Sequence, residues 1–351
     1  GMTDTYTYMA DGVRELEYPV PNPEPIARLL HGLREDERLG ILHTDNGNPS
    51  IIAENLEPSE EITKTLVETL SDGAVLSFGL ESADPSVHEA NWLNCDPAQL
   101  KSAIRLINKH GSVRGERGLP KLLPGLNFIA GLNGETEQTY TMNMDLLREI
   151  RKEGLLLRRI NIRQVEGEGF QEVPGEAFTG FKTACRDEID KPLLEELFPM
   201  GHVIHDIHWE SHDGRTRLPI HETELHRDPG IHGKSGITFG RQIGAYPILV
   251  GAEYKIPLET QSSVVITGHG ARSITGVEIS MDPLKVSEKQ LEAIPGIGKK
   301  SAWNLVAARA KSFRKRAGGL PFVDPQSWFK QANIPWNDDF TPFFAPINHS
   351  E

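Results

Sequence analysis

Polar side chains gather where the predicted strands of the N-terminal half end. The segment 77–94, SFGLESADPSVHEANWLN, places Glu81 and Ser82 after an apolar run, and the segment 126–140, LNFIAGLNGETEQTY, places Glu135 after another. Binding and catalytic groups of parallel α/β domains collect at the carboxyl ends of the strands. The residues at or beyond such ends are Asp11, Asp45, Asn46, Glu81, Ser82, Asn133, Glu135 and Arg163. They predict a polar rim for a ligand; ordinary polar loops are the alternative.

The segment 285–316 carries a second pattern that could do chemistry. It contains LEAIPGIGKKSAWNLV at 291–306, in which Gly296 and Gly298 separate two apolar helical stretches. Glycine permits turn conformations that a Cβ forbids, and the backbone N–H groups before a helix starting near Lys299 suit an anion. Nine Lys and Arg residues against two Glu give this segment a charge of +7, in a chain of net charge −13. Nucleic-acid phosphates are the natural ligand of such a patch.

The sequence IPGIGKK resembles the hairpin of the helix-hairpin-helix motif of DNA and RNA enzymes. A second, degenerate copy is expected at 323–336, where Asn-Ile-Pro replaces the glycine turn. The resemblance implies that the glycine amides hold phosphate without reading base sequence. The implied nucleic-acid-binding residues are Gly296, Gly298, Lys299 and Lys300. Helix packing, or contact with a protein partner, is the alternative use of the hairpin.

Alternating strands and helices must position the polar rim. Strands are predicted at 5–9, 39–44, 73–80, 123–131 and 157–165. Helices are predicted at 24–36, 58–71, 97–109 and 135–153. Repeated strand–helix units favour a parallel sheet, either open or curled into part of a barrel.

The rest of the chain changes character twice. A glycine-rich loop and a helix near 179–197 follow the alternating region, and 201–282 contains short β-type runs without a long helix. These runs predict a small antiparallel β-barrel or sandwich. The predicted domains are 1–200, 201–282 and 283–351, the last being the helical hairpin domain.

Two motifs resemble the radical S-adenosylmethionine (radical SAM) enzymes. In that family a strand reading G-[IL]-E-S-x-x-x-x-V precedes a strand reading F-I-x-G-x-x-G-E-T, and here GLESADPSV and FIAGLNGET stand in that order. The likeness covers 5–165 and implies an incomplete (β/α) barrel. It implies that Glu81 and Ser82 lie near the ribose or methionine part of the cofactor, and that Ile129 and Gly131 lie beside the adenine. The implied cofactor-binding residues are Glu81, Ser82, Ile129, Gly131, Glu135 and Arg163.

The cysteines depart from the family pattern. A [4Fe–4S] cluster needs thiolate ligands, usually spaced C-x3-C-x2-C, but this chain has only Cys95 and Cys185. Two explanations are open: the chain is cut from a longer protein that carries the cysteines, or it is a degenerate relative without a cluster. Either way we expect this chain alone to bind no cofactor and no metal and to be inactive. The parent of the first explanation would use S-adenosylmethionine and a [4Fe–4S] cluster.

The order of the regions is similar to an archaeal-type group of radical SAM proteins with a C-terminal helix-hairpin-helix. The 201–282 segment resembles, by position and β content, the RNA-binding barrel of tRNA methylthiolating enzymes. The first hypothesis is therefore a radical SAM iron–sulfur enzyme, an oxidoreductase acting on nucleic acid, with tRNA modification as the candidate reaction. The second is a non-catalytic nucleic-acid binder on a degenerate scaffold, and the third is a radical enzyme whose hairpin contacts a protein.

Composition limits the cellular compartment and the kinds of site that these hypotheses allow. The 351 residues are 38% hydrophobic, and no apolar run approaches the roughly 20 residues of a membrane helix. The polar N-terminus and the two distant cysteines predict a reducing, cytoplasmic setting. Seven histidines between 202 and 232 fit no compact zinc pattern, so scattered surface histidines are favoured over a metal site.

Overall fold

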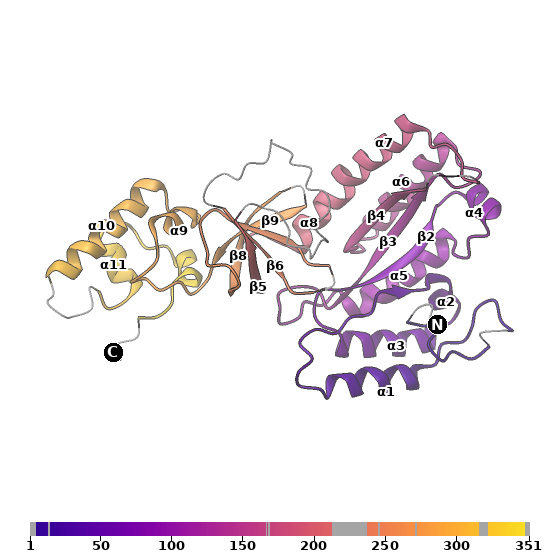
Figure 1. Ribbon diagram of the computed structural model, residues 1–351, viewed down its shortest axis with the longest axis horizontal. Coiled ribbons are helices and arrows are strands. Elements are labelled where there is room, and N and C mark those ends of the chain that lie inside the picture. The colour runs from indigo at the N-terminus through magenta and orange to yellow at the C-terminus, as the bar shows by residue number, and fades with distance from the viewer. Residues whose placement is uncertain are drawn as a thin grey trace. The chain divides into compact units, whose positions relative to one another are not determined.

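The computed structural model describes residues 5–12, 15–165, 167, 169–212, 237–244, 246–270, 272–315 and 322–347. The chain forms two compact units. The first contains residues 1–197 together with 244–246, and the second contains 198–243 together with 247–351. Figure 1 shows a strand–helix region in the first unit and a barrel followed by helices in the second.

A four-stranded parallel sheet forms the centre of the first unit. Its strands occur in chain order, and each pairs with the next in parallel. They are β1 (Asn46–Gly47), β2 (Ala74–Glu81), β3 (Leu122–Ala130) and β4 (Arg159–Gln164). The predicted parallel α/β architecture is therefore confirmed, and so are the predicted strands at 73–80, 123–131 and 157–165 within one or two residues.

Two predicted strands are wrong. Residues 5–9 form turns, and 39–44 form no strand, so the edge strand is the two-residue β1. Tyr6 is fully buried, with its hydroxyl 2.8 Å from Oγ1 of Thr63 in α3. The backbone N–H of Leu42 donates to the Ser71 hydroxyl instead of to a strand. The alternating pattern of 5–9 therefore reflects the burial of Tyr6 against helix α3, and these residues form turns instead of a β-strand.

Six helices accompany the sheet. They are α1 (Pro23–Arg34), α2 (Pro49–Glu54), α3 (Leu56–Thr69), α4 (Pro85–Asn91), α5 (Pro97–Gly111) and α6 (Glu137–Lys152). The short α2 and α4 were not predicted, although each begins with an Asx–Pro pair like the one that starts α5. Asn48, Asp84 and Asp96 each accept hydrogen bonds from helical N–H groups, and proline follows each of them at the first helical position.

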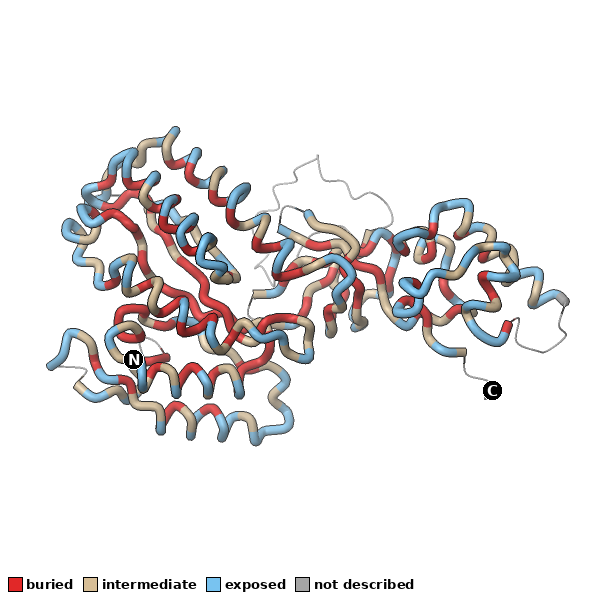
Figure 2. Tube along the Cα trace, turned by 180° about the vertical axis from the view of Figure 1, so that it is seen from behind, coloured by how far each residue is buried: buried red, intermediate tan, exposed pale blue. Residues whose placement is uncertain are grey.

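The apolar core lies between the sheet and these helices. Leu76 and Phe78 of β2 and Leu126 and Phe128 of β3 are buried in it, together with residues of α3, α5 and α6. The buried positions in Figure 2 follow the strands and the inward sides of the helices. Only alternate strand residues belong to this core, because successive side chains point to opposite faces of a sheet.

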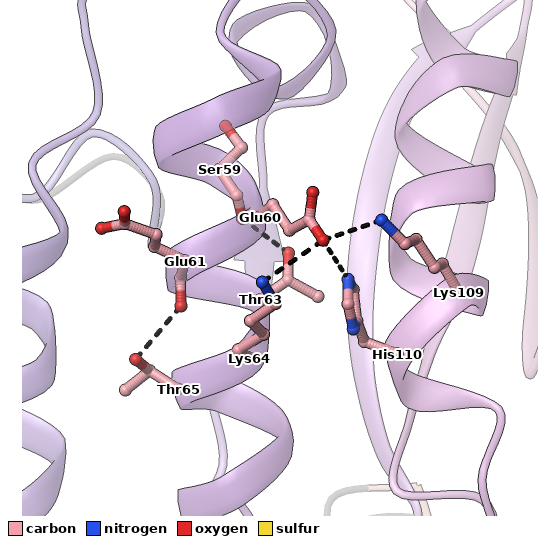
Figure 3. Close-up of polar contacts among 8 residues, drawn as sticks. All are labelled: Ser59, Glu60, Glu61, Thr63, Lys64, Thr65, Lys109 and His110. Atoms are coloured by element: carbon pink, nitrogen blue, oxygen red, sulfur yellow. Dashed lines mark hydrogen bonds and ion pairs between the residues drawn. The ribbon is translucent and has the colours of Figure 1, made fainter.

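A polar cluster links α3 to α5 (Figure 3). Oε1 of Glu60 accepts a 2.8 Å hydrogen bond from Nζ of Lys109 and lies 2.9 Å from Nε2 of His110. The hydrogen bonds from Lys109 and His110 lower the pKa of Glu60 to about 2. This carboxylate therefore stays ionised and joins the two helices across most of the pH range.

A continuous helical segment ends the first unit. It comprises α7 (Gly175–Ala184), a π-helical turn (Cys185–Asp190) and α8 (Lys191–Leu197). The predicted helix at 179–197 is therefore confirmed but begins four residues earlier. Phe181 of α7 packs edge-on against Phe128 of β3, which adds α7 to the helices over the apolar face of the sheet.

The second unit opens with a closed five-stranded barrel. Its strands are β5 (Val203–Ser211), β6 (Thr238–Gln242), β7 (Leu249–Ala252), β8 (Gln261–His269) and β9 (Ser273–Glu278). Trp209 is fully buried and donates from Nε1 to Oγ of Ser262 at 2.7 Å. The predicted small β-barrel is confirmed, although β7 and β9 pair in parallel while the other neighbouring pairs are antiparallel.

Helices complete the second unit, which joins the predicted second and third domains. They are α9 (Glu288–Ala293), α10 (Lys299–Lys315) and α11 (Pro325–Gln331), followed by a 3-10 turn at Asp338–Phe343. Leu291, Ile294, Ile297 and Leu305 are buried between α9 and α10. After α11, Asn333 adopts a positive φ of 56° at the position of the expected second hairpin. None of the helices that the structure describes is long and apolar enough to cross a membrane.

Candidate functional site

The second face of the parallel sheet is polar. Gly79 pairs with Asn127, and Asn127 pairs with Asn161, so these residues form one row across three strands. Ile129 pairs with Arg163 in the next row along that face. Parallel sheets usually carry apolar residues on both faces, because helices cover both. A polar face therefore indicates a surface that meets a ligand or the interior of a barrel.

Hydrogen bonds order the side chains of this polar face. Nδ2 of Asn161 donates to Oδ1 of Asn127 at 2.9 Å, and Nε of Arg159 donates to Oδ1 of Asn161 at 2.8 Å. The guanidinium of Arg159 lies 4.6 Å from the ring centroid of Tyr246. The polar groups of the face are therefore held in fixed positions before any ligand arrives.

Tyr246 closes one end of the face. This residue belongs to the first unit, although it lies between β6 and β7 in the sequence. Its hydroxyl donates to Oδ1 of Asp45 at 2.9 Å and lies 3.3 Å from Oγ of Ser77. Its carbonyl accepts a 2.8 Å hydrogen bond from Arg158. Sequence reasoning missed Tyr246, because no local pattern around it points to a sheet so distant in the chain.

A cavity of about 530 Å³ opens at the carboxyl end of the strands. Its walls include Asn46 of β1, Ser77 and Glu81 of β2, and Asn127 of β3. Trp92 also lines it, with a side chain 93% exposed and a left-handed φ of 55°. The sequence predicted the carboxylate of Glu81, and the structure adds Trp92 to the lining. The lining combines carboxylate, amide and hydroxyl groups with one aromatic ring and suits a polar organic molecule.

Glu81 is a strained carboxyl group in the cavity lining. It ends β2 at an irregularity in the pairing with β3 and has a positive φ of 68°, which is uncommon for a residue with a Cβ. Its Oε2 is buried and has no hydrogen-bond partner among the residues that the structure describes. Burial raises its pKa to about 6, against the opposing effect of the Arg163 charge. A strained residue with an unsatisfied buried oxygen is typical of a binding site.

Glu135 and Gly131 occupy the loop beyond β3. Oε2 of Glu135 accepts from the backbone N–H of Gly131 at 2.9 Å and from the hydroxyl of Tyr140 at 2.8 Å. The Glu135 side chain is almost fully buried, so its carboxylate orders the loop and is not among the groups that line the cavity. Gly131 has a φ of +97°, and a Cβ there would lie 2.5 Å from the carbonyl oxygen of Val165.

Ser82 likewise orders a loop. It is fully buried, its Oγ accepts the backbone N–H of Asp84 at 3.2 Å, and its carbonyl lies 2.5 Å from Nε2 of His88. Of the predicted cofactor-binding residues, the structure thus places Glu81 at the cavity, with Ile129 and Arg163 on the adjoining polar face. Ser82, Gly131 and Glu135 shape the loops behind it. Asp11 forms a bridge with Val20, apart from these groups.

The two cysteines lie in buried positions. Cys95 lines the cavity but is almost fully buried, and burial raises the pKa of its thiol to about 12. Cys185 is also buried. No group of three His, Cys, Asp or Glu side chains within the described ranges could hold a metal ion. His221, His226 and His232 lie outside those ranges.

The hairpin between α9 and α10 presents its glycines to solvent. Gly296 adopts a φ of +90°, and open space surrounds the position where a Cβ of Gly298 would lie. Lys299 and Lys300 are exposed at the start of α10. The first N–H groups of a helix have no intrahelical acceptor, so this end of α10 can receive an anion.

The basic patch of 285–316 has fewer unpaired positive charges than the sequence predicts. Lys289 pairs with Glu292 at 2.6 Å, and Lys285 lies 3.5 Å from Asp282. Arg309 donates to the carbonyl of Pro283 and lies over the ring of Trp328. Of the patch residues that the structure describes, Lys299, Lys300, Lys311 and Arg314 are exposed and form no ion pair. The side chains of residues 315 and 316 lie outside the described part.

Comparison with known proteins relates this architecture to longer archaeal chains. No protein-family model matches the sequence. An uncharacterized protein of Archaeoglobus fulgidus is 36% identical over 307 residues, which cover 84% of this chain and 53% of that protein. An uncharacterized protein of Methanocaldococcus jannaschii is 35% identical over 282 residues, which cover 77% of this chain and 48% of that protein. The chain thus spans about half the length of the curated relatives it matches.

Proposed function

We propose that this chain is the C-terminal portion of a radical SAM iron–sulfur enzyme that acts on nucleic acid. The observation that carries the proposal is the adjacency of β2 and β3. These strands bear GLESADPSV and FIAGLNGET, they pair in parallel, and residues of both line the cavity of about 530 Å³. The first motif therefore lines a ligand-sized hollow with Gly79, Leu80 and Glu81, and the strand that carries the second motif contributes Asn127, directly before that motif.

The cavity has suitable groups for S-adenosylmethionine. The buried Oε2 of Glu81 needs a donor, which a ribose hydroxyl or the ammonium of the methionine part can supply. Asn127 and Ser77 offer further polar atoms. The half-buried Ile129, on the adjoining polar face, would offer an apolar contact for the adenine. These residues would orient the cofactor and exclude water, while the cofactor itself would supply the radical chemistry.

The cysteines of this chain do not fit an iron–sulfur cluster. Both are buried, and the Cys95 thiol resists ionisation, whereas cluster ligands are thiolates. We therefore propose that the ligands belong to the longer protein and that this chain alone is inactive. The two buried cysteines, which lie far apart in the sequence, also agree with a reducing, cytoplasmic location.

We infer that the sheet is part of a (β/α) barrel whose remaining strands lie in the longer protein. The polar face described above would then be the barrel interior. A hollow of about 400 Å³ lies beside the edge strand β1 and is lined by Ile26, Leu29 and Leu33 of α1. Leu29 and Leu33 are exposed, and an apolar hollow at an open sheet edge suits coverage by further chain.

A non-catalytic nucleic-acid binder is the second candidate. The unsuitable cysteines favour it, because a degenerate scaffold would need no cluster ligands. The gene sequence upstream of Met2 separates the two candidates. A C-x3-C-x2-C motif in frame supports the enzyme, whereas a start codon at Met2 without such a motif supports the binder and overturns the enzyme.

Two binding measurements test the rest of the proposal. Calorimetric titration of the longer protein with S-adenosylhomocysteine should show binding that Glu81→Gln weakens. Lys299→Glu combined with Lys300→Glu should lower nucleic-acid affinity and flatten its salt dependence by about 2 in slope, because two phosphate contacts are lost. An unchanged affinity and slope would assign the hairpin to packing or to a protein partner.

A further inference from the structure

The solvent-facing side of α10 carries an aromatic ring among cations. Residues three and four apart share one face of a helix, and the residues Lys299, Lys300, Trp303, Ala307, Ala310, Lys311 and Arg314 follow that spacing. We name this set the α10 stripe. The inward side has other partners: Leu305 accepts from Nε1 of Trp328, and Ser312 donates to Gln331.

Trp303 is unusual among the tryptophans of its unit. Its side chain is 60% exposed, whereas Trp209 and Trp328 are fully buried and donate hydrogen bonds from Nε1. A large apolar ring in water is unfavourable unless a partner covers it, so Trp303 indicates a contact surface.

The charges around Trp303 identify the kind of partner. The α10 sequence, KKSAWNLVAARAKSFRK, contains no acidic residue. The nearby Glu292 is already paired with Lys289. The four exposed cations of the α10 stripe therefore flank the Trp303 ring, and no acidic residue of α10 neutralises them. Their charge complements that of a polyanion. Between Lys300 and Arg314 the helix rises about 20 Å, which equals roughly six stacked nucleotides.

We propose that the α10 stripe binds unpaired nucleic acid, with Trp303 stacked on a base and the flanking cations on phosphates. Aromatic stacking needs the free face of a base, which a single strand or loop offers and the interior of a duplex does not. Lys299 and Lys300 would hold the phosphates on one side of the stacked base, and Lys311 and Arg314 those on the other. This inference rests on the proposed nucleic-acid function and specifies its substrate class.

Matched substitutions of Trp303 test the stacking. Trp303→Leu keeps an apolar side chain with good helix propensity but removes the ring, whereas Trp303→Phe keeps a ring. Fluorescence anisotropy would measure affinity for oligouridylate and for a blunt RNA duplex at several salt concentrations. Trp303→Leu should weaken oligouridylate binding about five- to a hundredfold, and Trp303→Phe should restore most of it. Duplex affinity and the salt slope should stay unchanged, since no charge is removed.

Other results would overturn the inference. Unchanged oligouridylate affinity in Trp303→Leu, together with a loss in the double Lys299→Glu and Lys300→Glu variant, would refute stacking and leave the proposed function standing. Absence of nucleic-acid binding by the unmodified chain would refute both. Competition by polyglutamate as strong as by oligouridylate would assign the stripe to an acidic protein. Circular dichroism of each variant should show unchanged helix content.

Discussion

The hydroxyl of Tyr140 donates a 2.8 Å hydrogen bond to Oε2 of Glu135, and both side chains are buried. The same oxygen accepts the N–H of Gly131. One carboxylate thus joins the end of β3 to the first turns of α6, which orders the loop beside the candidate cavity.

Tyr140→Phe should lower the free energy of unfolding by about 1–3 kcal/mol, because it leaves a buried carboxylate oxygen with one donor fewer. Urea unfolding at neutral pH measures the change. Tyr18→Phe is the matched control, since the half-buried Tyr18 forms no side-chain hydrogen bond within the described residues. Equal stabilities of Tyr140→Phe and the unmodified chain would mean that water replaces the hydroxyl.

Gly131→Ala should destabilise the chain more than Gly154→Ala. Both glycines have positive φ, which costs alanine about 1–2 kcal/mol. Only at Gly131 does the added Cβ also meet a backbone oxygen, that of Val165 at 2.5 Å, while open space surrounds the same position at Gly154. Overpacking should bring the cost at Gly131 to about 3 kcal/mol or more. Similar unfolding midpoints for the two variants would contradict this close approach.

Glu81 should make stability fall as pH rises from about 4.5 to about 6. Its folded pKa of about 6 lies above its usual value of 4.5, so the folded state holds more protons in that window. Glu81→Gln should reduce this fall in urea unfolding measured across the window. Arg163→Gln should move the fall to higher pH, because the Arg163 charge opposes the rise in the Glu81 pKa. A fall of unchanged size in Glu81→Gln would assign it to another group.

Neither cysteine should react with a thiol reagent in the folded chain. Both thiols are buried, and thiolate is scarce at Cys95 because its pKa is about 12. Ellman's reagent at about pH 8 should label both cysteines in denaturant only. Incubation with iron and sulfide should likewise give no cluster absorbance. Labelling of the folded chain, or uptake of a cluster, would show that a cysteine is accessible.

Local patterns correctly predicted β2, β3 and the start of α5, although they missed β1, α2 and α4, which also border the cavity. The apolar runs that precede Glu81 and Gly131 form β2 and β3, and the Asp96–Pro97 pair starts α5. These signals are local, because a cap or a short buried strand depends on residues close in sequence. The same reasoning predicted a strand at 5–9, where Tyr6 instead packs against α3. An alternating apolar pattern indicates which side chains are buried, but it does not identify the element against which they pack.

By itself, the sequence determined the order of the α/β region, the barrel and the hairpin, and it located Glu81 and the lysines of α10. Only the tertiary structure decided that Tyr246 closes the polar face, that the Glu135 carboxylate holds a loop, and that Trp303 is exposed. The reason is physical: propensity and periodicity act over a few residues, whereas exposure and hydrogen-bond partners depend on segments that are distant in the chain.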